Sequence, residues 1–532
     1  MRPADYLVFL AYFVLVTSYG FWIYRRKRSD VVSSADFFLA EGALTWWAIG
    51  ASIIASNISA EQFIGMSGSG FALGLAVAGY EWGGGAALLI VAIFMMPGYV
   101  KNHIFTMPQF LTQRYGKLVA TIMAVFWLLV YVFVNLTSIL YLGALTAEGM
   151  TGVSFQLCVA FLAVFALVIA LGGMKVIGYT DVLQVAVLVV GGLATTWLAL
   201  SLVATQFGQS GVFAGLSLLR EHAPTHFHMI LPEGHKYYMD LPGLSVVIGG
   251  MWVANLNYWG CNQYITQRAL GANVGTARKG ILFAASLKLL MPLIVVVPGI
   301  AVYVLHQQGQ FATELLDATG TVKPDKSYSA LISLLPVGLK GLSFAALTAA
   351  IVASLAGKAN SIGTIFTLDI YKRYVNPQAS EVRLVGVGRI AIAVAMVIGL
   401  LIAPQLSRLE QATQFIQEYT GFISPGVVVI FLLGFFWRGA TSHAALTVAL
   451  LTIPLSAGCK FFLPHMPFMD RMGWVTVVLA VLMVGISLLT ANQEDEAKAF
   501  EWEAKDFHPG EGFIVGSVLF MGALVALYAV FW

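Results

Sequence analysis

The chain has 532 residues, of which 59% are hydrophobic and only 10% are charged, with a formal net charge of +3. This composition excludes a soluble globular domain, because such domains carry about 25% charged residues. It predicts an all-α polytopic membrane protein with a single membrane domain over residues 1–532, and the lipid bilayer as its surroundings. A transmembrane β-barrel is not expected, because the apolar stretches are continuous and do not alternate with polar residues.

Division of the chain at its charged and Pro/Gly-rich segments predicts about 14 membrane-spanning helices. They are expected at residues 5–24, 44–70, 73–97, 119–147, 153–173, 179–205, 242–266, 279–306, 336–371, 384–403, 409–436, 441–459, 472–489 and 511–531.

The basic residues predict how these helices are oriented. Arg25, Arg26, Lys27 and Arg28 follow the first helix directly, and simple alternation brings most other loop Lys and Arg to the same side. The positive-inside rule assigns that side to the cytoplasm. Both termini are therefore expected on the outer side of the plasma membrane, which would be the inner membrane in a bacterium.

The second predicted helix contains polar residues in the middle of apolar sequence: Ser56, Asn57, Ser59, Glu61 and Gln62. An unpaired polar group in hydrocarbon costs several kcal/mol, so such residues should face a cavity or partners. Gly65, Gly68 and Gly70 follow and predict a break in the helix. A broken helix at membrane depth exposes carbonyls to a cation and amides to a polar solute.

A weak internal echo occurs about 200 residues later, where V-A-N-L-N-Y-W-G-C-N-Q surrounds Asn255. Five predicted helices start from each of the two polar spans, and two repeats with an odd number of helices must insert with opposite topology. We therefore expect a first inverted repeat at 44–205 and a second at 242–436. Helices 5–24 and 441–531 are expected to be peripheral.

Several motifs, in order along the chain, resemble the sodium/solute symporter family, and within it the bacterial sodium/galactose and animal sodium/glucose cotransporters. They are N-I-S-A-E-Q-F-I-G-M-S-G-S-G at 57–70, Y-E-W at 80–82, Y-T-D-V-L-Q at 179–184, W-V-A-N-L-N-Y-W-G-C-N-Q-Y-I at 252–265, F-T-L-D-I-Y-K at 366–372 and I-Q-E-Y-T-G at 416–421. The resemblance implies a leucine-transporter-type core with broken helices.

For the substrate, the resemblance implies hydrogen-bonding residues at Asn57, Gln62, Glu81, Asn255, Lys288 and Gln417, walls at Tyr80 and Met66, and an inner aromatic gate at Tyr258 and Trp259. The chemistry agrees, because every hexose hydroxyl both donates and accepts hydrogen bonds. Glu81 and Lys288 are ionisable residues in apolar spans, which need partners or water. The alternative is a purely structural buried pair.

For the coupling ion, the resemblance implies a sodium site made of the Ala55, Ile58 and Ala350 carbonyls and the Ser354 hydroxyl. Hard cations prefer such oxygen ligands. Asp181 resembles an acidic residue on the sodium exit route, although a helix-start cap would also explain it. Sodium is the only cofactor expected.

Three residues depart from the family pattern. Gly84 and Ala353 stand where relatives commonly carry serine, so each position lacks a hydroxyl. Lys358 lies one turn beyond Ser354. It could snorkel toward the cytoplasm, or it could approach the cation site when sodium leaves and so modify or replace sodium coupling.

Together these features predict a sodium-coupled secondary active symporter that imports a glucose- or galactose-like monosaccharide by alternating access. The alternatives are symport of myo-inositol, a uronate or an amino acid, proton coupling, or a membrane sugar sensor. An enzyme is not expected, because neither H-E-x-x-H nor G-x-S-x-G occurs. No nucleic-acid partner is expected, and the oligomeric state is not predicted.

The remaining chemically reactive residues predict no second site. Cys158, Cys261 and Cys459 are far apart in apolar segments and are expected to be unpaired thiols. Residues 206–240 form an outer loop with His222, His226, His228 and His235, for which a metal site is the alternative to a solvated loop. The acidic stretch 494–511 is expected to be a solvated cytoplasmic loop.

Overall fold

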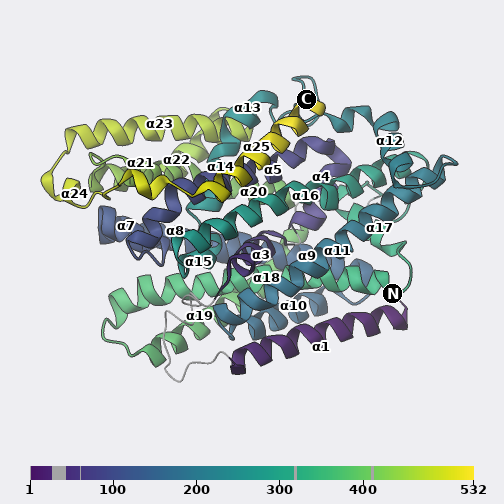
Figure 1. Cartoon of the computed structure of the whole chain (residues 1–532), viewed down its shortest axis with the longest axis horizontal. Helices are drawn as coiled ribbons and strands as arrows, with labels where there is room; N and C mark the ends of the chain where they lie inside the picture. The colour runs from purple at the N-terminus through teal and green to yellow at the C-terminus, as the bar shows by residue number, and fades with distance from the viewer. Residues whose placement is uncertain (1, 27–43, 60, 317–319, 409–411) are drawn as a thin grey trace.

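The computed structural model is described here for residues 2–26, 44–59, 61–316, 320–408 and 412–532 (Figure 1). In these ranges the chain is helical, and the only β pairing is an isolated bridge between Leu316 and Val322. The helices run roughly parallel to the long axis of the molecule (Figure 1).

The α-helices of the described residues are, in chain order, α1 (Pro3–Arg26), α3 (Trp46–Asn57), α4 (Met66–Leu73), α5 (Ala78–Ile90), α6 (Met96–Lys101), α7 (Met107–Tyr115), α8 (Lys117–Leu129), α9 (Thr137–Thr151), α10 (Phe155–Ala170), α11 (Met174–Gln206), α12 (Val212–His222), α13 (Gly243–Ile248), α14 (Gly250–Gly260), α15 (Gln263–Leu270), α16 (Val274–Gln307), α17 (Ser327–Ser333), α18 (Leu339–Ile365), α19 (Glu381–Ile402), α20 (Ala412–Gly421), α21 (Ser424–Phe436), α22 (Ser442–Phe462), α23 (Phe468–Leu489), α24 (Gln493–Ala497) and α25 (Glu511–Val530).

Eleven helical segments of the described chain are long and apolar enough to cross a membrane, and α10 is a shorter apolar helix. Each of these overlaps a predicted helix, although the segment Gln62–Lys101 joins the end of predicted helix 44–70 to predicted helix 73–97. The predicted helices 44–70 and 242–266 are interrupted, so neither is counted as a span of its own. An all-helical, multi-span architecture is therefore confirmed, whereas the number of 14 spans stays a prediction.

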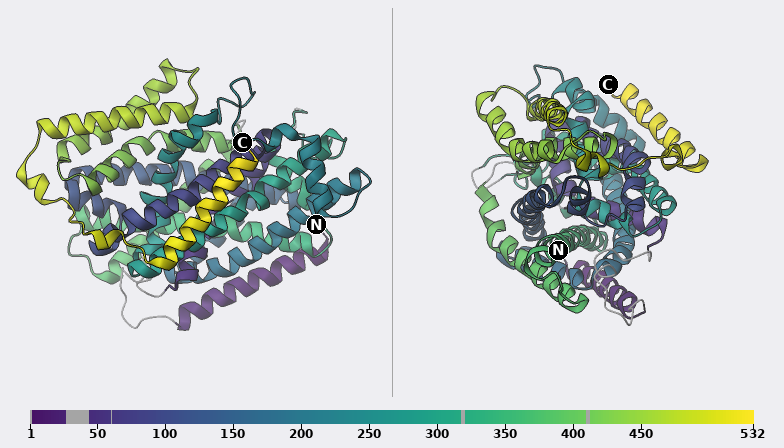
Figure 2. Two further views of the ribbon diagram at one scale, coloured as in Figure 1. Left: turned by 45° about the horizontal axis from the view of Figure 1, so that its top comes forward. Right: turned by 90° about the vertical axis from the view of Figure 1, so that its left-hand side faces the viewer.

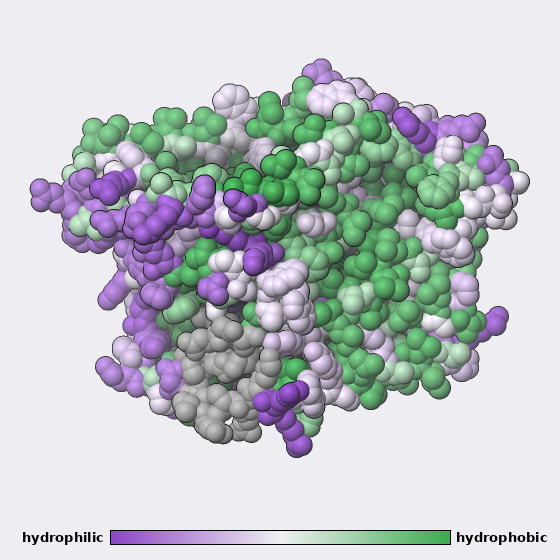
Figure 3. Space-filling view, viewed as in Figure 1, coloured by the Kyte–Doolittle hydropathy of each residue, from purple (hydrophilic) through white to green (hydrophobic). Residues whose placement is uncertain are grey.

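Two helices organise the packing. Helix α16 contacts α3, α4, α5 and α11, and helix α18 contacts α1, α10, α11 and α19. Helices α1 and α25 lie on the outside of the bundle (Figure 2). The outward faces of α10, α23 and α25 carry exposed apolar side chains, among them Val164, Val481 and Val518. Figure 3 shows such residues over much of one face, with hydrophilic residues gathered toward the end near α7 and α24, as expected for a surface in contact with lipid.

The first interruption separates α3 from α4. Helix α3 ends at Asn57, Ile58 adopts an extended conformation, and a π-helical turn at Glu61–Gly65 leads into α4. The prediction that glycines cause this break is wrong, because the helix ends before Gly65. The glycines instead permit close packing: a Cβ on Gly70 would lie 2.5 Å from the Val296 carbonyl oxygen of α16.

The second interruption separates α14 from α15 at Cys261 and Asn262. The Asn262 side chain accepts a hydrogen bond from the Tyr264 backbone N–H at 3.2 Å and so caps α15. Tyr131 donates a hydrogen bond to the same Asn262 oxygen. A further break at Phe422 and Ile423 separates α20 from α21. Polar residues are thus brought to helix ends, where the backbone itself has unsatisfied groups.

The cysteines form no disulfide among the described residues, and the outer-loop histidines make separate contacts with other parts of the protein. All three cysteines are free, as predicted. Among the outer-loop histidines, His226 is buried at 3.0 Å from the Phe71 carbonyl, His222 stacks on Phe207, and His228 contacts the Trp532 carbonyl. In the part of the chain that the structure covers, no group of three or more His, Cys, Asp or Glu could hold a metal.

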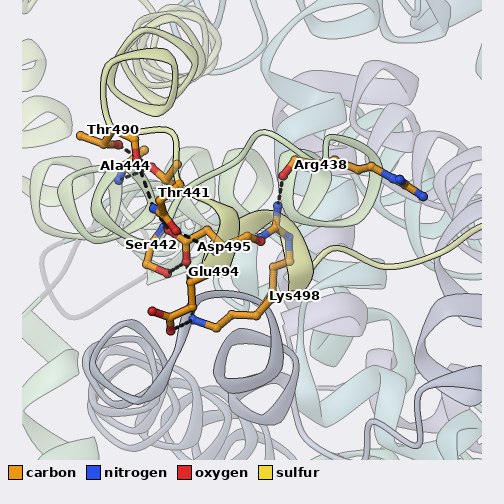
Figure 4. Close-up of polar contacts among 10 residues, drawn as sticks. Arg438, Thr441, Ser442, Ala444, Thr490, Glu494, Asp495 and Lys498 are labelled. Carbon is orange, nitrogen blue, oxygen red and sulfur yellow. Dashed lines mark hydrogen bonds and ion pairs between the residues drawn. The ribbon is translucent and has the colours of Figure 1, made fainter.

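The acidic segment at 494–511 is partly built into the protein, so the expectation of a merely solvated loop is wrong for Asp495. The Asp495 carboxylate accepts hydrogen bonds from the Ser442 backbone N–H at 2.9 Å, the Ser442 hydroxyl and the Asn492 amide (Figure 4). Arg114 is fully buried and donates to the Asp495, Gly434 and Trp437 carbonyls. These bonds fasten α24 to the start of α22 and the end of α21.

Replacement of Asp495 by Asn should lower the melting temperature of the purified protein at neutral pH. Burial alone would raise the pKa of the Asp495 carboxyl, but the hydrogen bonds from Ser442 and Asn492 and the charge of Lys498 hold this pKa below its ordinary value. The stabilisation is therefore complete above the unfolded-state pKa of about 4 and is lost as pH falls through the lower folded-state value. The difference in melting temperature between wild type and Asp495→Asn should be constant from pH 8 to 5 and should become smaller only in stronger acid. Glu496→Gln, at an exposed neighbour, is the control and should show no such difference.

Candidate functional site

A polar chamber of about 130 Å³ lies between the interrupted helices. It is lined from α3, α4, α5, α14, α16, α18, α20, α21 and α23. The structure brings together in its wall all the residues predicted to bind or gate a substrate: Asn57, Gln62, Met66, Tyr80, Glu81, Asn255, Tyr258, Trp259, Lys288 and Gln417. Lys358 also lines the chamber. These residues are as much as 360 positions apart, since Asn57 and Gln417 share the cavity.

The charged centre of the chamber is the pair formed by Lys288 of α16 and Glu81 of α5. The Lys288 Nζ lies 2.6 Å from Glu81 Oε2, and the side chains are only 1% and 2% exposed. Lys288 also donates to the Asn57 Oδ1 and lies 4.7 Å from the centre of the Trp259 ring. Two opposite charges in contact make this centre neutral overall, which reduces the large desolvation cost of each ion.

Amides on the two interrupted helices are held by the gate residues. The Asn57 Nδ2 donates to the Tyr258 hydroxyl at 3.3 Å, which links the end of α3 to α14. The Trp259 Nε1 donates to the Asn255 Oδ1 at 3.2 Å. The two predicted gate residues, Tyr258 and Trp259, thus form hydrogen bonds with Asn57 and Asn255, which are predicted to bind the substrate.

Several buried polar atoms of the chamber wall have no hydrogen-bond partner among the described residues. They are the Tyr80 hydroxyl, the Asn255 Nδ2, the Asn257 Oδ1 and the Thr420 hydroxyl. A buried polar group without a partner costs about 1–3 kcal/mol. Donors and acceptors that are both left unsatisfied around one cavity fit a solute with several hydroxyl groups, which can satisfy both kinds.

Six further polar lining residues were not predicted: Ser69, Asn135, Asn257, Asn262, Thr420 and Ser424. The Asn257 Nδ2 donates to the Ser424 hydroxyl at 2.9 Å. Thr420 lies three residues after Gln417 on α20, so helical spacing from Gln417 could have indicated it, whereas Ser424 lies beyond the break, at the start of α21. Phe468, Met469 and Met472 of α23 also reach the chamber. No signal pointed to them, because a peripheral helix was not expected to contribute to the site.

The end of α3 approaches α18 at the residues predicted to bind sodium. Ser354 donates from its hydroxyl to the Ser56 carbonyl at 3.1 Å and lies 3.0 Å from the Tyr264 hydroxyl. Ala55, Ile58, Ala350 and Ser354 are all buried. Helix α3 ends at Asn57, next to these residues. The carbonyls at a helix C-terminus carry partial negative charge and favour a cation.

Asp181 lies about two turns inside α11 and is 1% exposed. Its Oδ2 accepts from the Ser52 hydroxyl at 2.5 Å and lies 3.6 Å from the Arg268 Nη2. Arg268 in turn donates to the Ser52 carbonyl at 2.9 Å. Asp181 therefore connects α11 with α3 and α15. Of these, α3 carries Ala55, one of the predicted sodium ligands.

Lys358 is 3% exposed, four residues after Ser354 on α18. Its Nζ lies 5.1 Å from the centre of the Tyr264 ring, and the hydroxyl of that ring contacts Ser354. The ammonium is thus next to the predicted cation site and faces the chamber, so it does not snorkel to the surface.

A polar chamber enclosed by interrupted helices in an apolar bundle is the architecture of a membrane transporter for small solutes. The chain belongs to the sodium:solute symporter family, whose family model matches residues 37–451. It is accordingly a multi-pass, sodium-coupled transporter and not an enzyme.

Two relatives share the sequence of this chain over most of its length, and one solved structure shares its fold. It is 46% identical to a sodium/glucose cotransporter of Vibrio parahaemolyticus, over 99% of this chain and 98% of the relative. It is 34% identical to a sodium/myo-inositol cotransporter 2 of Oryctolagus cuniculus, over 84% of this chain and 68% of the relative. A solved Na⁺-coupled sialic acid symporter has the same fold, with a TM-score of 0.79 and 20% identity over 92% of this chain and 98% of that chain.

The buried pair predicts a specific pattern of stability. Lys288→Met should lower the melting temperature strongly, because an unpaired buried Glu81 costs about 3–5 kcal/mol. The double variant Lys288→Met/Glu81→Gln removes both charges and should recover most of the melting temperature, but not transport. A double variant as unstable as the single one would contradict the role of the pair.

Proposed function

We propose that the protein imports a neutral monosaccharide together with sodium by alternating access. The single observation that carries this proposal is the set of unpartnered donors and acceptors around a charge-compensated centre. A hexose matches both features, because it is uncharged and each hydroxyl donates and accepts. The relative named as a sodium/glucose cotransporter supports the same substrate class.

A cyclic polyol such as myo-inositol is the second candidate. It offers the same hydroxyl chemistry, and the chain is 34% identical to a sodium/myo-inositol cotransporter 2. A uronate or an amino acid fits less well, because the Lys288 charge is already neutralised by Glu81 at 2.6 Å. An anionic group would have to displace Glu81 from this contact.

For coupling, we assign sodium to the Ala55, Ile58 and Ala350 carbonyls and the Ser354 hydroxyl. The ion would hold the end of α3 against α18 and so shape the neighbouring chamber wall at Asn57. The contact between Ser354 and the Ser56 carbonyl supports this site, because it joins the same two helices. Asp181 accepts a hydrogen bond from Ser52, which is on α3 like Ala55, and would lie on the route by which sodium leaves.

The architecture that would perform alternating access is a pair of inverted repeats at 44–205 and 242–436. The interruptions of α3–α4 and α14–α15 occur near the start of each repeat, which supports this division. Helices 5–24 and 441–531 would lie outside the two repeats, although α23 reaches the chamber. Both chain termini would lie on the outer side of the plasma membrane, with the basic loops in the cytoplasm.

The energetics of this coupling are sufficient for accumulation. One positive charge that crosses 100 mV releases about 2.3 kcal/mol. Since about 1.4 kcal/mol corresponds to a tenfold ratio, the membrane potential alone supports roughly fifty-fold accumulation with one sodium per sugar. A sodium concentration gradient adds to this.

The decisive experiment measures uptake of labelled glucose, galactose and myo-inositol into proteoliposomes with and without a sodium gradient, with a uronate and an amino acid as competitors. Sodium-dependent sugar uptake is expected, and Gln62→Ala and Lys288→Ala should abolish it. Because Lys288→Ala also disturbs a buried pair, Gln62→Ala is the cleaner test. Gly79→Ala, outside the chamber wall, is the control. Sodium-dependent uptake of labelled myo-inositol without uptake of either sugar would support the second candidate, and wild-type uptake in both variants would contradict the site.

The neighbouring Lys358 should affect sodium affinity. A fixed ammonium beside the cation site repels sodium, so Lys358→Met should lower the sodium concentration for half-maximal uptake, whereas Ser354→Ala should raise it. The sodium dependence of uptake in the same proteoliposomes measures both. An unchanged sodium dependence in Lys358→Met would show that this lysine takes no part in coupling.

A further inference from the structure

Gly84 lies at a point of unusually close approach between α5 and α14. A Cβ at this position would lie 2.8 Å from the Trp259 Nε1 and 3.2 Å from the Asn255 Oδ1. Carbon atoms do not tolerate such a distance from an indole nitrogen without a shift of the ring. Any residue other than glycine would therefore push Trp259 away from its present place, and with it the hydrogen bond to Asn255.

That hydrogen bond determines which end of the Asn255 amide faces the substrate. An indole N–H can only donate, so the atom 3.2 Å from the Trp259 Nε1 must be the amide oxygen. The NH₂ group of Asn255 then points the other way. It is buried, lacks a hydrogen-bond partner among the described residues, and belongs to a side chain that lines the chamber. It lies beside α5, where a Cβ on Gly83 would be 3.2 Å from the Asn255 Nδ2. Asn255 consequently keeps its NH₂ donors unpaired, whereas one of the two acceptor sites of its oxygen is already occupied by Trp259.

We propose that Gly84 is a specificity-determining residue: by leaving room for Trp259, it fixes the orientation of the Asn255 amide so that the NH₂ group remains available to donate to the substrate. This inference rests on the proposed function. It requires the substrate to offer an oxygen acceptor at this point of the chamber, such as a hydroxyl, ring or carbonyl oxygen. A group that can only donate is disfavoured there, because it leaves the Asn255 NH₂ group without an acceptor.

A simpler explanation of Gly84 makes different predictions. If glycine merely lacked a substrate-binding hydroxyl, Gly84→Ser would add a contact and Gly84→Ala would be neutral. If glycine provides room for Trp259, both substitutions crowd the indole and disturb the site. Gly79 offers a matched control on the same helix, because a Cβ there would meet only the Tyr528 hydroxyl at 3.4 Å and Val246 at 3.9 Å.

The first arm of the test measures melting temperatures and needs no substrate. Gly84→Ala and Gly84→Ser should both melt below wild type, whereas Gly79→Ala should not. Trp259→Phe, which shortens the ring, should restore the melting temperature of Gly84→Ala in the double variant. If Gly84→Ala and Gly84→Ser melt at the same temperature as wild type, the proposal is overturned. If the wild-type protein takes up no sugar, the proposed function fails. The melting temperatures still decide whether Gly84 provides the room that Trp259 needs.

The second arm compares the apparent KM of the transported hexose with those of its monodeoxy and monodeoxyfluoro analogues. Fluorine can accept a weak hydrogen bond but cannot donate one. At the ring position whose hydroxyl accepts from Asn255, replacement of the hydroxyl by fluorine should therefore lower the affinity less than replacement by hydrogen. Asn255→Ala should raise the KM of the parent sugar about tenfold, in line with the loss of one buried hydrogen bond. The same variant should abolish the difference between the fluoro and deoxy analogues at that position. Equal costs of fluorine and hydrogen at every position in wild type would overturn the donor assignment.

Discussion

The structure depends on the requirement that charges and amides inside an apolar bundle be compensated. Lys288 and Glu81 are almost fully buried and lie 2.6 Å apart, so each supplies the partner that the bilayer cannot. The Lys288 ammonium also binds Asn57 at the end of α3. One pair therefore joins α16, α5 and the first interrupted helix, and the rest of the chamber is arranged around it.

Interrupted helices make this arrangement possible. A continuous helix satisfies its own backbone groups and offers a solute only side chains, whereas a helix that ends mid-bundle also offers carbonyls and amides. Here α3 ends next to α18 and α14 ends next to α15, so that the ends of both interrupted helices lie close to the same cavity. The Ser354 hydroxyl donates to the Ser56 carbonyl and so joins the end of α3, whose Asn57 lines the chamber, to α18.

Glycines at helix contacts allow neighbouring helices to approach closely, and one of these contacts also involves a hydrogen bond in the chamber wall. Gly70 lets α4 approach the backbone of α16, and Gly84 lets the Trp259 indole approach α5. In the second case the contact also fixes the direction of an amide that lines the site. On the proposal made for Gly84, the absence of a side chain there controls which group of the Asn255 amide is available to a solute.

The amino-acid sequence by itself determined the helical membrane class, the approximate position of most helices and several of the polar residues that line the chamber. Continuous apolar runs and isolated polar residues within them have few physical interpretations in a bilayer, and the ordered motifs added the residue-level assignment. The sequence did not reveal that the first break precedes the glycines, nor that Asn257, Thr420 and α23 reach the chamber, nor that Asp495 is built into the fold. Only the tertiary structure decided these points, because helix breaks, unpartnered atoms and close approaches depend on which distant segments pack together, and hydropathy records burial without recording the partner.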